Sequence, residues 1–169
     1  MAKQVVLLLF FLIFFPLCAQ PAVKIHAVGA RMGWGRSAAL NVNNIIISGL
    51  SLNCGDLQRH LSLHAYIDYW NKTKHAGDNK IVSWRILGIS AITKHTFPNQ
   101  TNITPFVGGG VGFNFGKGES NATFDLAIHV LGGLSVPVTS RLNGLAEFKY
   151  SIDGADYFGI FLGMDYQIR

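Results

Sequence analysis

His60, Ser62 and His64 are the residues whose types and spacing come nearest to nucleophilic chemistry. A histidine can take the proton of a serine hydroxyl and so create a nucleophile, provided that a carboxylate orients the imidazole ring. No glutamate follows this segment before Glu119. No spacing of cysteine and histidine matches a metal site either. We therefore expect no catalytic residue, no metal and no cofactor.

A second group of chemically capable side chains lies on the polar positions of alternating segments. It mixes both signs of charge and consists of Arg31, Asp68, Arg85, Asp125, His129, Glu147, Lys149 and Asp165. If these side chains share a narrow interior, they could form a gate or a proton-linked switch. The alternative is a structural polar core, in which charges pair because an unpaired buried charge is costly. We expect the structural core.

The segments that carry these residues alternate apolar and polar side chains with a period of two, which predicts β-strands. Residues 158–168 show this most clearly, because large apolar side chains occupy every even position and mostly small or polar ones the odd positions. The same template predicts strands at residues 23–34, 45–53, 60–70, 80–95, 104–115, 123–134, 141–152 and 158–168.

The segment 80–95 is the least regular of the eight. We assign Val82, Trp84, Ile86 and Ile92 to its apolar face and Arg85 to its polar face. This choice places Arg85 with the other polar-face charges.

The connections between these segments are rich in glycine, asparagine, aspartate and proline, which favour turns. None is long enough for a helical crossover, so consecutive strands are predicted to be antiparallel. Connections at residues 35–44, 71–79, 116–121 and 153–156 then lie at one end of the sheet. Those at 55–59, 96–103 and 135–140 lie at the other end, together with the N-terminus.

The composition indicates strands in a membrane. The chain is 49% apolar and only 14% charged, yet it lacks the 18 or more unbroken apolar residues of a spanning helix. Opposite each apolar face lie glycines, hydroxyls and one or two charges, which suit a narrow lumen. Because lipid forbids an unpaired sheet edge, the strands must close. The predicted fold is all-β, an eight-stranded antiparallel up-and-down transmembrane β-barrel, with interfacial aromatics at Trp34, Tyr69, Trp84, Phe115, Tyr150 and Tyr166.

The first 20 residues have the features of a cleavable secretory signal peptide. Lys3 supplies the positive start, an apolar stretch covers residues 5–15, and Pro16 precedes the small residue Ala19. We therefore divide the chain into a signal peptide at 1–20 and a barrel domain at 21–169. Cys54 is then the only cysteine of the exported chain, so no internal disulfide is expected.

The C-terminal segment resembles the insertion signal of small bacterial outer-membrane barrels of the OmpA-like and OmpX-like kind. It places an aromatic residue three positions after Gly163 and a hydrophobic residue two further, at Tyr166 and Ile168. The stretches 104–112 and 135–142 also resemble paired strand motifs of this family. The resemblance implies insertion into the outer membrane by the barrel-assembly machinery. The chain departs from the family at its end, where Ile168 and Arg169 follow in place of a terminal Phe or Trp.

Several functions share this fold, because one barrel can serve as an adhesin, an enzyme, an envelope stabiliser or a pore. We expect a non-enzymatic, surface-exposed protein with an envelope-structural or adhesion-type role. It would be monomeric, in contact with outer-membrane lipid or lipopolysaccharide, and without a nucleic-acid partner. A lipid-modifying enzyme is one alternative, since His60 and Ser62 superficially resemble the histidine-x-serine element of lipid A deacylases. A small pore and a soluble ligand-carrying barrel are the others.

Overall fold

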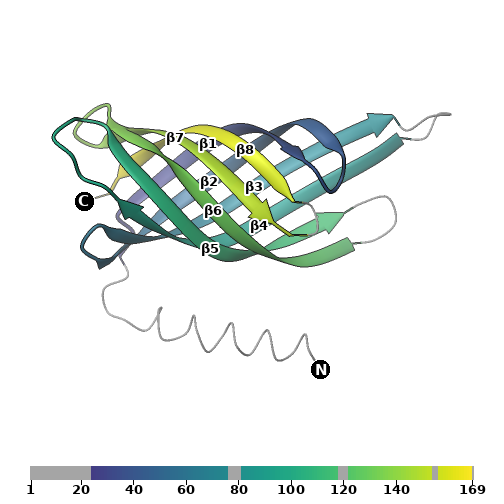
Figure 1. Cartoon of the computed structure of the whole chain (residues 1–169), viewed down its shortest axis with the longest axis horizontal. Helices are drawn as coiled ribbons and strands as arrows, with labels where there is room; N and C mark the ends of the chain where they lie inside the picture. Colours follow the sequence, from purple (N-terminus) through teal and green to yellow (C-terminus); the bar gives the residue numbers. More distant parts are fainter. Residues whose placement is uncertain (1–23, 76–80, 118–121, 154–155, 169) are drawn as a thin grey trace, which may run out of the picture.

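The computed structural model describes residues 24–75, 81–117, 122–153 and 156–168, without the side chains of residues 74, 75, 81 and 82. They form one closed barrel in which each strand pairs with its sequence neighbours and β8 pairs with β1 (Figure 1). The strands are β1 (Ala27–Ser37), β2 (Val42–Gln58), β3 (Leu61–His75), β4 (Ile81–Thr96), β5 (Thr104–Lys117), β6 (Ala122–Pro137), β7 (Leu142–Ile152) and β8 (Tyr157–Gln167). The predicted eight-stranded antiparallel up-and-down barrel is confirmed. The proposed signal peptide lies outside the described residues.

The barrel closes through a continuous antiparallel register between its first and last strands, from Ala27 opposite Gln167 to Ser37 opposite Tyr157. The sheet is therefore closed between its first and last strands. Beyond the closed part, residues 71–75 of β3 extend past their pairing with β2, and residues 122–127 of β6 extend past their pairing with β7. In the part of the chain that the structure describes, no helix is long and apolar enough to cross a membrane.

The second strand is longer than predicted, because the glycine and aspartate at 55–56 form a bulge instead of a turn. Gly55 has a φ of 107°, and the register between β2 and β3 shifts between Asn53 and Asp56. Such a bulge lets a strand continue past an extra residue. The chain reverses only at Arg59 and His60, where His60 has a φ of 65°.

Side chains alternate between the lumen and the outer surface along most of each strand, as the period of two requires, and the alternation is interrupted where the register of β2 shifts. On β3, for example, Tyr66, Asp68 and Trp70 are buried while Ile67 and Tyr69 are exposed. The predicted faces of β1, β3, β5, β6, β7 and β8 agree with this arrangement.

Strand β4 faces the opposite way from the prediction. Ile86 and Ile92 are buried in the lumen, whereas Leu87 and Ile89 are exposed. Arg85, which we predicted in the lumen, is exposed on the outer surface. Trp84 is likewise no interfacial aromatic, because it is partly buried against an inner apolar cluster.

The reason lies in the neighbouring strand β5. Its inward positions beside Lys94, Ile92 and Ser90 of β4 are occupied by glycines, Gly108, Gly110 and Gly112. Because these positions carry no side chain, the lumen has room for large residues from β4. A Cβ added at Gly108 would lie 2.9 Å from Leu131 Cδ1 and 3.3 Å from Lys94 Cγ, so the space is already filled.

Two apolar clusters fill the lumen at different heights. On β3, Trp70 belongs to the first cluster and Tyr66 to the second, with Asp68 between them. The first cluster contains Val42, Ile45, Ile47, Trp70, Ile86, Tyr157 and Phe161. The second contains Tyr66, Ile92, Phe106, Leu131 and Leu145. The ionised side chains of the lumen gather between the two.

Candidate functional site: the charged layer of the lumen

Arg31 is the centre of this charged layer. Its Nη2 donates to both carboxylate oxygens of Asp68, at 2.7 and 2.8 Å, and its Nη1 donates to Oε1 of Glu147. Glycines surround it: a Cβ at Gly49 would lie 3.0 Å from Arg31 Nε, and one at Gly163 would lie 2.8 Å from Arg31 Cβ. The glycines of the lumen face therefore make room for the guanidinium.

Two lysines extend the layer on either side of the arginine. Lys149 Nζ lies 2.8 Å from Oδ2 of Asp68, and Lys94 Nζ lies 2.9 Å from Oε2 of Glu147. The Tyr66 hydroxyl donates to the same Glu147 oxygen at 3.2 Å. The result is a chain of alternating sign that runs Lys149, Asp68, Arg31, Glu147, Lys94, with three cations and two carboxylates.

Aromatic rings stabilise the excess positive charge. The Arg31 Cζ atom lies 3.8 Å from the ring centre of Tyr66 and 4.6 Å from that of Phe161. Lys94 Nζ lies 4.2 Å from the ring centre of Phe106. Cations over aromatic faces are attracted by the ring quadrupole, most strongly where water is excluded.

Deep burial makes the charged layer a structural unit. The five ionised side chains are at most 6% exposed. Removing an ion from water costs several kcal/mol, which is offset only when its partners stay in place. Each of these ions has a partner of opposite sign, so no charge in the layer is available to bind a substrate without breaking a pair.

The structure brings together four of the eight predicted lumen residues, namely Arg31, Asp68, Glu147 and Lys149, in this layer. Asp165 accepts a hydrogen bond from Ser51 at 2.9 Å. His129 is buried, and its Nδ1 has no hydrogen-bond partner among the described residues. Asp125 is half-buried and forms no ion pair within the described residues. Arg85 does not reach the lumen.

Sequence reasoning missed two members of the layer, Lys94 and Tyr66. Tyr66 was placed on the lumen face without a role. Lys94 was missed because it shares the parity of Ile86 and Ile92, which we assigned to lipid. A signal was present, since Gly88, Ser90 and Lys94 on that parity repeat the small and polar composition of the other lumen faces.

No protein-family model and no curated protein sequence matches the chain. Solved structures do match. The crystal structure of neisserial surface protein A is 16% identical with a TM-score of 0.61, over 84% of this chain and 95% of that one. The fold is that of the small outer-membrane β-barrels. Ail, the attachment invasion locus protein of Yersinia pestis, matches at 12% identity and a TM-score of 0.59, over 85% and 97% of the two chains. The N-terminal barrel domain of Pseudomonas aeruginosa OprF matches at 13% identity and a TM-score of 0.55, over 85% of this chain and 98% of that one.

In this small-barrel fold, the serine and histidine considered for catalysis face inward. Ser62 Oγ and His64 Nε2 lie 2.9 Å apart, and each residue is 8% exposed. We expected His60 to point inward with Ser62, and this expectation is wrong, because His60 lies exposed in the turn between β2 and β3. No hydrogen bond joins His64 to a carboxylate within the described residues. The same residues contain no cluster of histidine, cysteine and carboxylate that could hold a metal ion.

Of the predicted insertion signal, Tyr166 and Ile168 lie at the C-terminal end of β8 and just beyond it, and Gly163 lies near the middle of this strand. Tyr166 and Ile168 are exposed on the outer surface, whereas Gly163 faces the lumen beside Arg31. This geometry presents Tyr166 and Ile168 outward. Their role in insertion stays a prediction.

Proposed function

We propose that this chain is a non-enzymatic integral protein of the bacterial outer membrane, with an envelope-structural or adhesion-type role at the cell surface. The observation that carries the proposal is the outer surface of the barrel, where large apolar side chains are exposed on all eight strands. Examples from six of the strands are Met32, Ile46, Ile89, Leu126, Phe148 and Leu162. Soluble monomers rarely expose contiguous apolar patches beyond a few hundred Å². A hydrocarbon surrounding accounts for such a surface.

The aromatic side chains support the same surroundings. Trp34, Tyr69, Phe115, Tyr150 and Tyr166 are each at least 41% exposed on the outer surface. Aromatic residues of this kind flank the apolar band of membrane barrels, where their rings lie at the level of the headgroups. These five are the predicted interfacial aromatic residues except Trp84, which lies inside the barrel.

A surface role without catalysis agrees with the ion pairing of the charged side chains in the lumen. The charges of the layer bind one another, and Ser62 and His64 are enclosed by the barrel wall. Two proteins of the same fold are, by their names, a surface protein and an attachment invasion locus protein. We propose that this chain likewise presents its connections to the outside of the cell.

For the orientation, we propose that both chain ends face the periplasm. The connections at 38–41, 76–80, 118–121 and 153–156 then face outward, and those at 59–60, 97–103 and 138–141 face the periplasm. Secretion through a signal peptide at residues 1–20 and insertion by the barrel-assembly machinery are parts of the same proposal.

Labelling of intact cells tests both the location and the orientation. In full-length protein with Cys54 replaced by serine, a membrane-impermeant maleimide should label Ala39→Cys in the β1–β2 connection. It should leave the matched variant Asn99→Cys, in the β4–β5 connection, unlabelled until the cells are lysed. Labelling of position 99 alone would invert the orientation. A protein that fractionates without the outer membrane, or that migrates identically before and after boiling, would overturn the proposed function.

A further inference from the structure

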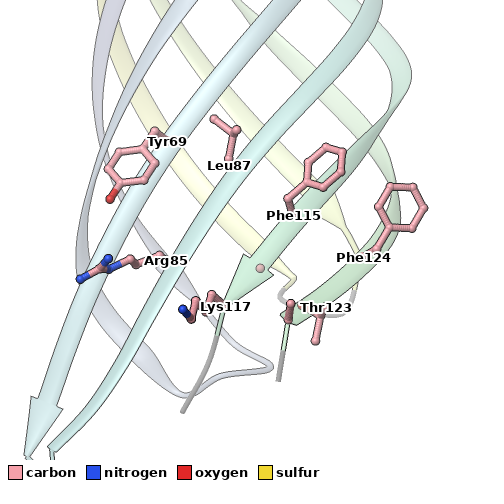
Figure 2. A pocket seen from close by; sticks show the side chains of 9 residues that line it. Tyr69, Arg85, Leu87, Phe115, Lys117, Thr123 and Phe124 are labelled. Atoms are coloured by element: carbon pink, nitrogen blue, oxygen red, sulfur yellow. The ribbon is translucent and has the colours of Figure 1, made fainter. Parts of the chain in front are cut away.

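A shallow hollow of about 450 Å³ lies on the outside of the barrel, across strands β3 to β6. Figure 2 shows its lining near the β5–β6 connection. Tyr69, Leu87, Phe115 and Phe124 form its apolar part, and Phe115 and Phe124 meet edge to face with ring centres 5.2 Å apart. Two cations, Arg85 and Lys117, complete it together with Thr123.

The two cations occupy paired positions on neighbouring strands. Arg85 of β4 is the register partner of Lys117 of β5, and both are exposed on the outer surface. Like charges directly opposite on neighbouring strands are destabilising. Neither residue forms an ion pair within the described part of the chain, and the lining contains no carboxylate. An anion bound in the hollow that both cations line would therefore offset their repulsion.

The polarity of the hollow changes along the barrel axis. Figure 2 shows Arg85, Lys117 and Thr123 toward the strand ends, and Tyr69, Leu87 and the two phenylalanines farther along the barrel wall. The register agrees, because Arg85 precedes Leu87 on β4 and Lys117 follows Phe115 on β5. Past the hollow, exposed apolar side chains continue toward the middle of the wall, at Ile89, Val111 and Leu126. Such a gradient is complementary to an amphiphile with an anionic head and an acyl chain.

We propose that this hollow binds a phosphorylated, acylated lipid of the outer leaflet, the lipid A part of lipopolysaccharide. Arg85 and Lys117 would hold one phosphate, since a guanidinium offers several donors and an ammonium adds a compact charge. Leu87, Phe115 and Phe124 would lie along an acyl chain. The inference rests on the proposed outer-membrane location and orientation.

The test uses folded protein in detergent micelles and native mass spectrometry, with bisphosphorylated lipid A as the probe. Wild-type protein should retain one lipid A molecule. The double variant Arg85→Gln/Lys117→Gln should bind it about tenfold more weakly, because two charge-assisted contacts to phosphate are lost. Arg36→Gln is the matched control, since Arg36 is an exposed cation on β1 away from the hollow. It should bind as the wild type does.

A second pair of variants tests the acyl-chain part. Phe124→Ala should weaken retention of lipid A, whereas Phe158→Ala should not, although both remove an exposed phenylalanine from the outer surface. Inorganic phosphate at the same concentration should fail to displace the lipid. Complete displacement would identify a site for a free anion and overturn the proposal, as would equal retention by the wild type and the double variant.

Failure of this inference is distinguishable from failure of the proposed function. Each variant is first checked for heat-modifiable migration and for location in the outer membrane. A folded, outer-membrane protein that retains lipid A equally with and without the two cations contradicts only the lipid site. A protein absent from the outer membrane contradicts the proposed function itself.

Discussion

The basic side chains inside the barrel and those at the hollow on its outside find their counter-charges differently. Inside, Arg31, Lys94 and Lys149 share two carboxylates at hydrogen-bonding distance. Outside, Arg85 and Lys117 occupy paired positions, and no carboxylate belongs to the described lining of the hollow. An unpaired charge is costly in the lumen and tolerable at an exposed position. Burial, more than residue type, thus decides whether a basic side chain needs a carboxylate from the same chain.

The largest effect on stability is expected from removing one carboxylate of the charged layer in the lumen. Glu147→Gln leaves Arg31 and Lys94 without one of their carboxylate partners in a buried site, which should lower the free energy of unfolding by about 3 to 5 kcal/mol. Urea unfolding in detergent micelles measures the loss. Asp125→Asn is the matched control, because Asp125 is half-buried and forms no ion pair among the described residues.

Conductance of the same variant separates a structural layer from a gate. With a structural layer, planar-bilayer current through Glu147→Gln stays at the wild-type background. A gate would instead conduct once the charge is removed, while the unfolding midpoint moved little. That result would contradict the structural reading of the lumen.

The next effect concerns the two faces of a single strand. Leu162 lies at the middle of β8 and is 69% exposed, so Leu162→Arg should destabilise the inserted barrel by about 2 to 4 kcal/mol. Leu162→Met, of similar volume, should be tolerated. Gly163→Arg should fail for another reason, because even a Cβ there would meet Ala30 O at 2.7 Å. Equal tolerance of arginine and methionine at position 162, measured by folding into lipid vesicles, would argue against this register.

A smaller loss of stability is expected at the glycine face of β5, where the side chains of β4 fill the lumen. Gly108→Ala should cost about 1 to 3 kcal/mol, since the added Cβ would lie 2.6 Å from the backbone oxygen of Thr93 and 2.9 Å from Leu131 Cδ1. Gly109→Ala, one residue along on the outer surface, meets nothing closer than 3.5 Å and should unfold like the wild type. Urea midpoints that fall equally for both variants would contradict the assigned faces.

The smallest effect belongs to the outer cations. In detergent free of lipid A, Arg85→Gln should change the free energy of unfolding by less than about 0.5 kcal/mol, because an exposed charge without a partner contributes little. A loss as large as that of Glu147→Gln would erase the contrast between the two regions. The unfolding experiment on both variants in one buffer makes the comparison direct.

The regular alternation of most strands was sufficient to predict their faces from the sequence. On β8 and β7 most of the large apolar residues share one parity and all the charges lie on the other, and a period of two leaves only two possible orientations. On β4 both parities carry large apolar residues, Ile86 and Ile92 on one and Leu87 and Ile89 on the other. Local pattern could not choose between them.

The sequence by itself determined the all-β class, the number and order of the strands and most of the residues that face the lumen, because these follow from alternation and from short connections. The tertiary structure decided the orientation of β4, through the glycine face of β5 beside it. It also decided the pairs, such as Lys94 with Glu147, which are 53 positions apart in the chain. Contacts across a lumen depend on the stagger between strands that are not neighbours, and no local pattern encodes that stagger.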